Sequence, residues 1–277
     1  MTINYIKKAC NNLGLKHQDI DEAGVFIKVE LDSNKFHFFI ANNLGLNDEV
    51  VYKINRDKVY THNLLDKYIK MPRSTSYVDT QYADLYQGFS KFESHDEIVS
   101  DIVKNNSLPV IIKPNSKEQG TNVFCCQTKN EVENAVKTIF DKKSFNYDHV
   151  LLVEGKIDIL EEFRIVFYKG KVQFIYQKDN KNKDSKFSGN LSPLHFENAR
   201  AVLISEKSKT FENLNTFIQP IFQQLNIVYG GLDVAIDNSG DIYLFEINSN
   251  PGFSYFVRDN SEKILVEMFE KIIKDLL

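Results

Sequence analysis

Three oxygen-bearing side chains lie in two apolar, strand-like segments near the C-terminal end of the chain. Asp233 stands inside residues 231–236, while Glu246 and Asn248 stand two apart in and just after residues 242–247. Residues two apart on a strand share a face, and a hairpin through residues 237–240 would bring Asp233 opposite them. Neighbouring buried carboxylates need a cation, and Mg²⁺ prefers oxygen ligands. The pattern predicts a magnesium site; the alternative is a sheet whose polar face is simply acidic.

A lysine closes another apolar segment. Residues 109–114 read Pro-Val-Ile-Ile-Lys-Pro, and a polar loop that contains Gly120 follows. Lys113 can place its ammonium group against a phosphate while the amides of the loop cover the rest of that group. The segment is not a Walker A motif, because no Gly-Lys-Ser/Thr opens a helix here. A phosphate contact is one interpretation, and a solvated lysine at a strand end is the other.

A third segment has the features of a nucleotide-base site. The strand-like run 150–154 leads into Gly155, Lys156 and Ile157, and Glu161 and Glu162 follow a few residues later. An irregular turn offers N–H and C=O groups to a purine edge, and a carboxylate can accept hydrogen bonds from both ribose hydroxyls. Each glutamate taken alone is equally well explained as surface charge.

The periodicity of apolar residues predicts the elements that must position these groups. Spacings of three and four predict helices over residues 3–13, 58–68, 95–105, 130–140, 206–225 and 261–276. Short apolar runs predict strands at 25–31, 35–40, 108–114, 123–126, 150–154, 164–168, 172–176, 231–236 and 242–247. Residues 177–190 read as a charged loop. Helices and strands mix without strict alternation, which favours an α+β fold over a doubly wound parallel sheet.

The composition is that of an ordinary folded protein. The 277 residues carry a net charge of −4, and the mean hydropathy is −0.34. This balance argues against a disordered chain and a general nucleic-acid binder, and no apolar run is long enough to span a membrane. The N-terminus lacks the apolar core of a signal peptide. Three cysteines are too few for a disulfide framework, so we expect buried thiols and a cytoplasmic protein.

Together and in this order, the three segments resemble the ATP-grasp superfamily, from about Asn55 to the C-terminus. The most specific part is the Glu-x-Asn-x-x-Pro-Gly run of residues 246–252 behind the Gly-x-Asp of residues 231–233. Residues 55–61, followed by Met71-Pro72, resemble the family's Asp-Lys helix that leads to a Val-Pro strand. The nearest relatives by motif are glutathione synthetases, cyanophycin-synthetase-like ligases and glutamate ligases that modify ribosomal protein tails. D-alanine–D-alanine ligases are further away.

The resemblance implies roles for the matching residues. Lys58 and Lys113 would contact the ATP phosphates under a flap that contains Gly120. Glu154 and the backbone of Gly155, Lys156 and Ile157 would hold adenine between the side chains of Ile111 and Phe245. Glu162 would bind the ribose. Asp233, Glu246 and Asn248 would bind Mg²⁺, for which Mn²⁺ is an acceptable substitute.

Two departures from the family pattern concern the catalytic cation. Residues 188–191 resemble the family's Arg-x-Asn-Leu segment, whose asparagine, here Asn190, lies near the phosphates and metal, but the arginine is Ser188. Gly231 stands where D-alanine ligases have an arginine. Arg164 and Lys186 are the candidates for steadying the oxyanion of an acyl phosphate. Because Arg164 lies in an apolar strand, its charge needs a partner, either a phosphate or Glu162.

The resemblance implies an ATP-dependent carboxylate–amine ligase that works through an acyl phosphate. The lysine-rich loop 178–186 favours an anionic amino acid or peptide as substrate, although a solvated loop explains it equally well. We favour glutathione-synthetase-like joining of γ-glutamylcysteine and glycine, with amino-acid or short-peptide ligation of the cyanophycin-synthetase type as the alternative. A small-molecule kinase on the same scaffold and an inactive nucleotide-binding module remain open.

The expected architecture is an ATP-grasp fold with a shortened N-terminal subdomain. Residues 1–89 would form that subdomain, residues 90–160 a small flap, and residues 161–277 the larger part with the metal site. The expected partners are small carboxylate and amine substrates, and neither nucleic acid nor a membrane. A homodimer is compatible with the resemblance.

Overall fold

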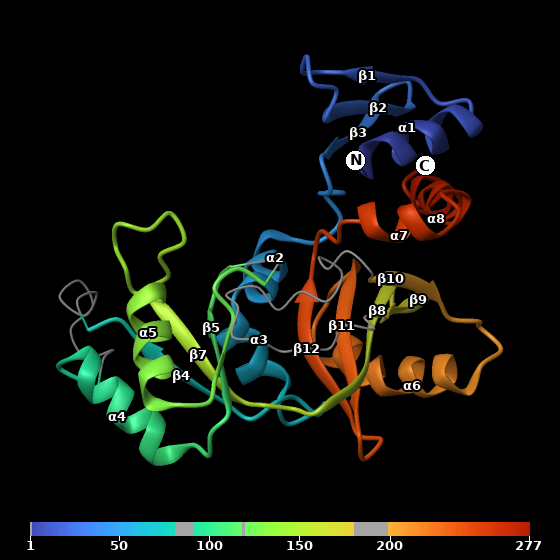
Figure 1. Ribbon diagram of the computed structural model, residues 1–277. Helices are drawn as coiled ribbons and strands as arrows, with labels where there is room; N and C mark the ends of the chain where they lie inside the picture. The colour runs from blue at the N-terminus through green and yellow to red at the C-terminus, as the bar shows by residue number, and fades with distance from the viewer. Residues whose placement is uncertain (1, 81–90, 118–119, 180–198) are drawn as a thin grey trace.

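The computed structural model describes residues 2–80, 91–117, 120–179 and 199–277. It contains three antiparallel sheets and their covering helices, so the predicted α+β class is confirmed (Figure 1). Within the described residues, no helix is both long enough and apolar enough to cross a membrane.

The first sheet and its covering helices bring together residues from both ends of the described chain. Its strands β1 (His17–Asp19), β2 (Phe26–Asp32) and β3 (Lys35–Ile40) lie in that order. One face packs against α1 (Thr2–Asn12) and α8 (Lys263–Lys274), next to α7 (Ser254–Asp259) (Figure 1). Ile6 of α1, Val29 of β2 and Phe269 of α8 belong to one buried core. The opposite face leaves Phe36, Phe38 and Ile40 exposed.

The second sheet has four strands in the order β4 (Ser74–Val78), β7 (Val150–Gly155), β5 (Val110–Pro114) and β6 (Phe124–Cys126). The helices α4 (His95–Asn105) and α5 (Lys129–Ile139) cover it and share its apolar core (Figure 1). The side chain of Ser94 caps the start of α4, and Thr128 with Glu131 forms a capping box on α5. These caps fix where both helices begin.

The third sheet carries the three predicted metal ligands together with Glu162, Arg164 and Phe245. Its five strands are β10 (Arg200–Leu203), β9 (Lys171–Asp179), β8 (Ile159–Tyr168), β11 (Tyr229–Asp237) and β12 (Ile242–Asn248), in that order. Side chains of one parity, such as Phe163 and Leu232, pack against α6 (Lys209–Gln224) in a dry core. Arg164 and Asp233 follow these residues directly on β8 and β11, so their side chains lie on the opposite face of the sheet.

Two short helices lie between the four-stranded and five-stranded sheets (Figure 1). These are α2 (Glu49–Arg56), which packs beside β12, and α3 (Lys58–Leu65), which reaches α6. The side chain of Asp57 caps α3 by accepting a hydrogen bond from the backbone N–H of Tyr60, 2.8 Å away. Lys58 therefore opens a helix at the junction of the two sheets.

The structure corrects several sequence predictions. The helix predicted over 58–68 ends at Leu65, and the helix predicted over 206–225 begins only at Lys209. The loop predicted over 177–190 is wrong at its start, since β9 continues to Asp179. The elements β1, α2, β4, β10 and α7 were not predicted. β4 lies in the part of the chain assigned to the N-terminal subdomain, but it pairs with β7 of the predicted flap. The division of the chain at residues 89 and 160 stays a prediction.

Candidate active site

The hairpin of β11 and β12 sets the register of the predicted metal ligands. Asp233 lies directly opposite Glu246, and Gly231 lies opposite Asn248. A bulge follows Asp233, where Phe245 is the extra residue on β12. Opposite residues of antiparallel strands point to the same side of the sheet, so Asp233, Glu246 and Asn248 share one face. The predicted hairpin is confirmed; the metal role of these residues stays a prediction.

Asp233 is one of four largely buried charges that lie together on this face. The guanidinium group of Arg164 donates two hydrogen bonds to the Asp233 carboxylate, one of them 2.7 Å long. The ammonium group of Lys178 lies 2.8 Å from Asp233 Oδ1 and 2.6 Å from Glu162 Oε1. Two cations thus face two carboxylates. Arg164 pairs with Asp233 and not with Glu162, the carboxylate partner that the sequence analysis considered.

Burial and ion pairs together set the pKa values of both carboxylates in this cluster. Burial raises the pKa of Asp233, but Arg164 and Lys178 outweigh that effect and lower it from 3.8 to about 2. For Glu162, burial wins over the attraction of Lys178, and its pKa is raised. Burial lowers the pKa of Lys178, yet the two carboxylates raise it overall. Asp233 is therefore held firmly as an anion and Lys178 as a cation.

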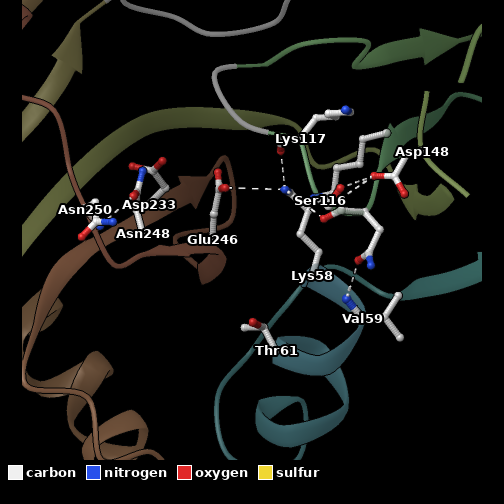
Figure 2. A network of polar contacts seen from close by, with 12 residues as sticks. Lys58, Val59, Thr61, Ser116, Lys117, Asp148, Asp233, Glu246, Asn248 and Asn250 are labelled. Atoms are coloured by element: carbon white, nitrogen blue, oxygen red, sulfur yellow. Dashed lines mark hydrogen bonds and ion pairs between the residues drawn. The ribbon is translucent and has the colours of Figure 1, made fainter. Parts of the chain in front are cut away.

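Lys58 connects this face to the loop after β5 (Figure 2). Its ammonium group lies 3.6 Å from Glu246 Oε1 and donates to the carbonyl oxygens of Lys117 and Asn115, at 2.7 Å and 3.3 Å. The Asn115 side chain donates to Asp57 at 2.7 Å and accepts from the backbone N–H of Val59 at 3.0 Å. The start of α3 is thereby docked onto the loop.

The same loop is held from its other side by a buried aspartate. Asp148 Oδ2 accepts hydrogen bonds from the backbone N–H of Ser116, at 2.7 Å, and from its hydroxyl group, at 2.8 Å (Figure 2). Gly120 follows with a φ of +72°, a conformation that costs glycine little. The first part of the loop is therefore fixed, and its backbone amides and Lys58 lie within one polar network.

Lys113 and Glu154 form a separate buried pair on the four-stranded sheet. Lys113 Nζ lies 2.7 Å from Glu154 Oε1, and both side chains are about nine-tenths buried. Ile111 is the register partner of Glu154. Beyond Glu154, Gly155 ends β7, and Lys156 lies 3.6 Å from Asp158 in the link to β8, which also contains Ile157. Lys113 is thus a buried strand residue whose charge Glu154 neutralises, and it is not a freely solvated lysine.

The comparisons with known proteins agree with this geometry. The family model described as D-ala D-ala ligase C-terminus matches residues 80–274. The chain belongs to this family. It is an ATP-grasp protein and an ATP-dependent carbon–nitrogen ligase, as the sequence predicted. Among curated proteins, none matches the sequence.

Solved structures of ATP-grasp ligases share the fold at low sequence identity. D-alanine–D-alanine ligase from Bacillus anthracis, complexed with ATP, has 18% identity and a TM-score of 0.52 over 80% of this chain and 68% of its own. A bifunctional glutathione synthetase from Pasteurella multocida has 13% identity and a TM-score of 0.61, over the whole of this chain but only 44% of its own.

A third similar structure matches over nearly its full length. It is a RiPP-associated ATP-grasp ligase from Chryseobacterium gregarium in complex with ADP and a leader and core peptide. Its identity is 14% and its TM-score 0.58, over all of this chain and 92% of its own. The predicted ATP-grasp fold is confirmed by these likenesses.

The chemistry of the ligase's donor set fits Mg²⁺, but the donors already have partners within the chain. Asp233, Glu246 and Asn248 offer oxygen atoms from one face, as a hard cation requires. The Asp233 carboxylate is engaged by Arg164 and Lys178, and Asn248 Oδ1 accepts from the backbone N–H of Asn250 at 3.2 Å. In the described part of the chain, no three His, Cys, Asp or Glu side chains already surround a common point. Metal binding by Asp233 would have to displace a cation.

Two predicted residues of the ligase cannot be placed. Lys186 and Asn190 lie outside the described residues, as does Ser188. Sequence reasoning also missed Lys178, which it assigned to a charged loop. The signal was present: Phe174, Tyr176 and Lys178 continue one strand alternation, and all three are buried. What the sequence of this segment alone lacks is the pair of carboxylates, on β8 and β11, that makes a buried lysine tolerable.

Two adjoining cavities open beside the ligase's predicted metal ligands. The first, of about 300 Å³, is lined by Glu246 and Asn248 together with Asn55 and Arg56 of α2. The second, of about 270 Å³, extends from the shared wall toward Tyr229. Asn43, Tyr52, Ser249 and Asn250 line both cavities. The loop after Asn248 therefore forms part of a polar hollow on the side of the hairpin that faces α2.

Proposed function

We propose that this ligase activates a carboxylate as an acyl phosphate and then joins it to an amine. A carboxylate oxygen attacks the γ-phosphorus of ATP, and the bond to the β–γ bridging oxygen breaks to release ADP. The amine nitrogen then attacks the acyl carbon, phosphate leaves, and the nitrogen loses a proton. The supporting observation is the concentration of Arg164, Lys178 and Lys58 around Asp233 and Glu246. Such fixed charges stabilise phosphoryl and acyl transfer without a covalent nucleophile.

Arg164 is the proposed cation for the oxyanion of the acyl phosphate. A Cβ atom added to Gly231 would lie 2.9 Å from Arg164 Cδ and 3.1 Å from Pro251 Cβ. Gly231 thus leaves space that the arginine of the neighbouring strand fills. This arrangement supports Arg164 as the replacement for the arginine that D-alanine ligases carry at the position of Gly231.

Mg²⁺ would be held by Asp233, Glu246 and Asn248, where it would neutralise phosphate charge. We further propose that Lys58 and Lys113 contact the phosphates below Gly120. Adenine would lie against Ile111 and Phe245 and form hydrogen bonds with the segment of Glu154, Gly155, Lys156 and Ile157. Glu162 is proposed for the ribose, whose hydroxyls would compete with Lys178 for that carboxylate.

For substrates we propose an anionic amino acid or short peptide and an amine, with γ-glutamylcysteine and glycine as the favoured pair. The lysine-rich sequence of residues 178–186 supports an anionic substrate, and the likeness to a glutathione synthetase agrees with this choice. Ligation of other amino acids or short peptides is the alternative, and the likeness to a ligase bound to peptides favours it.

The test is ADP release from Mg-ATP, followed by mass spectrometry. The protein is given γ-glutamylcysteine with glycine, then pools of amino acids and short peptides. We expect a product with the mass of both substrates minus one water, and none with Glu246→Gln. A phosphorylated acceptor without an amide product would move the assignment to a kinase. ATP binding without ADP release in every pool would reject the proposed ligation.

A further inference from the structure

The corner between α2 and α3 is formed by an aspartate that has no role in the proposed function. The backbone N–H of Asp57 donates to the carbonyl oxygens of Lys53 and Ile54, both at 3.2 Å, which ends α2. Its Oδ1 atom accepts from the backbone N–H of Tyr60 at 2.8 Å, which begins α3. Lys58 follows directly, so the place of its backbone depends on this corner.

The other carboxylate oxygen of Asp57 is bound by the loop after β5. Asn115 Nδ2 donates to Asp57 Oδ2 at 2.7 Å, and Asn115 Oδ1 accepts from the backbone N–H of Val59 at 3.0 Å. The carbonyl oxygen of Asn115 accepts from the backbone N–H and from the ammonium group of Lys58, at 3.4 Å and 3.3 Å. Asn115 is 4% exposed. One buried residue thus contacts three consecutive residues at the start of α3.

Asn115 is itself fixed on the four-stranded sheet. Its backbone N–H donates to the carbonyl oxygen of Val150 at 3.0 Å, which continues the pairing of β5 with β7. Lys113, the other lysine proposed for the phosphates, lies two residues earlier in the chain and is paired with Glu154. The contact between Asp57 and Asn115 therefore sets where the start of α3 lies relative to Lys113.

We propose that Asp57 and Asn115 position Lys58 against the phosphates of ATP. A lysine has a long flexible stem, so its charge is held in place only when its backbone and its neighbours are fixed. The ammonium group of Lys58 reaches the carbonyl oxygen of Lys117, at 2.7 Å, and Glu246 Oε1, at 3.6 Å (Figure 2). The inference rests on the phosphate contact proposed for Lys58. Asp57 and Asn115 are positioning residues, because they act through Lys58.

An exchange of the two side chains tests the pair directly. Asn115→Asp alone sets two carboxylates against each other, and Asp57→Asn alone leaves two amides that cannot make all three hydrogen bonds. With both substitutions, the amide at position 57 accepts from Tyr60 and donates to the carboxylate at position 115, which accepts from Val59, and the net charge is unchanged. Each single variant should weaken MgATP binding about 5- to 30-fold by calorimetry, and the double variant should return to within about 2-fold of the wild type.

A double-mutant cycle with Lys58 separates positioning from a general loosening of the fold. Asn115→Ala should weaken MgATP binding about 5- to 30-fold in the wild type, but less than about 2-fold when Lys58→Ala is already present. A merely structural role for Asn115 would weaken binding equally in both backgrounds. Asn106→Ala is the matched control and should leave binding unchanged, because its Nδ2 atom donates to the carbonyl oxygen of Ile102, at 2.9 Å, at the end of α4.

The outcomes distinguish this inference from the proposed function. If Lys58→Ala binds MgATP as tightly as the wild type, the phosphate contact proposed for Lys58 fails, and the inference fails with it. If Lys58→Ala weakens binding but the effect of Asn115→Ala is absent or simply adds to it, only the positioning inference is overturned. Urea unfolding shows which variants fold. Should Asn115→Ala not fold, the exchanged variant decides, and a folded exchanged variant that binds MgATP no better than the single variants overturns the inference.

Discussion

Replacing Asp233 by asparagine should cost stability as well as activity. The substitution keeps the shape of the side chain and removes its charge. Arg164 and Lys178, both almost fully buried, then lose the carboxylate that they share, and Glu162 remains paired with Lys178. Leaving a buried charge uncompensated is among the costliest effects of a single substitution. The protein should still fold, because the apolar cores on both sides of the sheet are untouched.

The magnitude follows from the pKa of Asp233. Its folded value of about 2 lies below the ordinary 3.8, and a shift of that size corresponds to about 2.5 kcal/mol at neutral pH. Breaking buried ion pairs in other proteins costs about 3–5 kcal/mol, so we expect about 3 kcal/mol. Because the folded pKa is depressed, the ionised carboxylate stabilises the wild type above about pH 4. That advantage is lost as the pH falls toward 2, and about half remains at pH 3.

Urea unfolding of the wild type and Asp233→Asn at pH 7 and pH 3 measures both quantities. Asp241→Asn is the matched control, because Asp241 pairs with Lys70 at 2.6 Å but both side chains are about half exposed. That control should lose less than about 1 kcal/mol. A loss below about 1 kcal/mol for Asp233→Asn at pH 7, or a loss that does not shrink at pH 3, would refute the electrostatic account.

Three further predictions concern other parts of the site and core. Gly231→Ala should lower the free energy of unfolding by about 1–3 kcal/mol, because the added Cβ would meet Arg164. Gly155→Ala is the control and should cause no such loss, because a Cβ at that position would have no atom within 4 Å. Equal losses in the two variants would contradict this reasoning. Lys113→Ala should weaken ATP binding about 10- to 100-fold by calorimetry, with exposed Lys137→Ala as the neutral control. Burial raises the pKa of the Cys10 thiol to about 11 and that of Cys126 to about 12, and it also raises the pKa of Cys125. No thiol should therefore react with a disulfide reagent at pH 8 before the protein unfolds. Rapid labelling of the native protein would contradict this prediction.

The elements with strong apolar periodicity were predictable. The hairpin of β11 and β12 consists of two apolar segments around an Asp-Asn-Ser-Gly turn, and this local pattern also predicted that Asp233 lies opposite Glu246. The helices α4 and α5 have a clear apolar stripe and were predicted within a residue of their observed ends. In these segments the local preference and the tertiary packing favour the same structure.

The remaining elements depend on partners that are distant in the sequence. β4 reads Ser-Thr-Ser-Tyr-Val and has no strong apolar pattern, but β7 supplies its hydrogen bonds. Lys178 lies in a strand because Glu162 and Asp233 neutralise it from two neighbouring strands. Reading one segment at a time therefore misses much of the polar face.

The core shared by α1, β2 and α8 has a consequence for synthesis of the chain. The ribosome makes α1 about 250 residues before α8, which takes about 10–50 s at typical elongation rates. During that interval Ile6 and Val29 lack the apolar side chains of α8, such as Phe269, that share their buried core in the finished protein. The first sheet is thus made well before its core is complete, and chaperones have a correspondingly long opportunity to bind its apolar face.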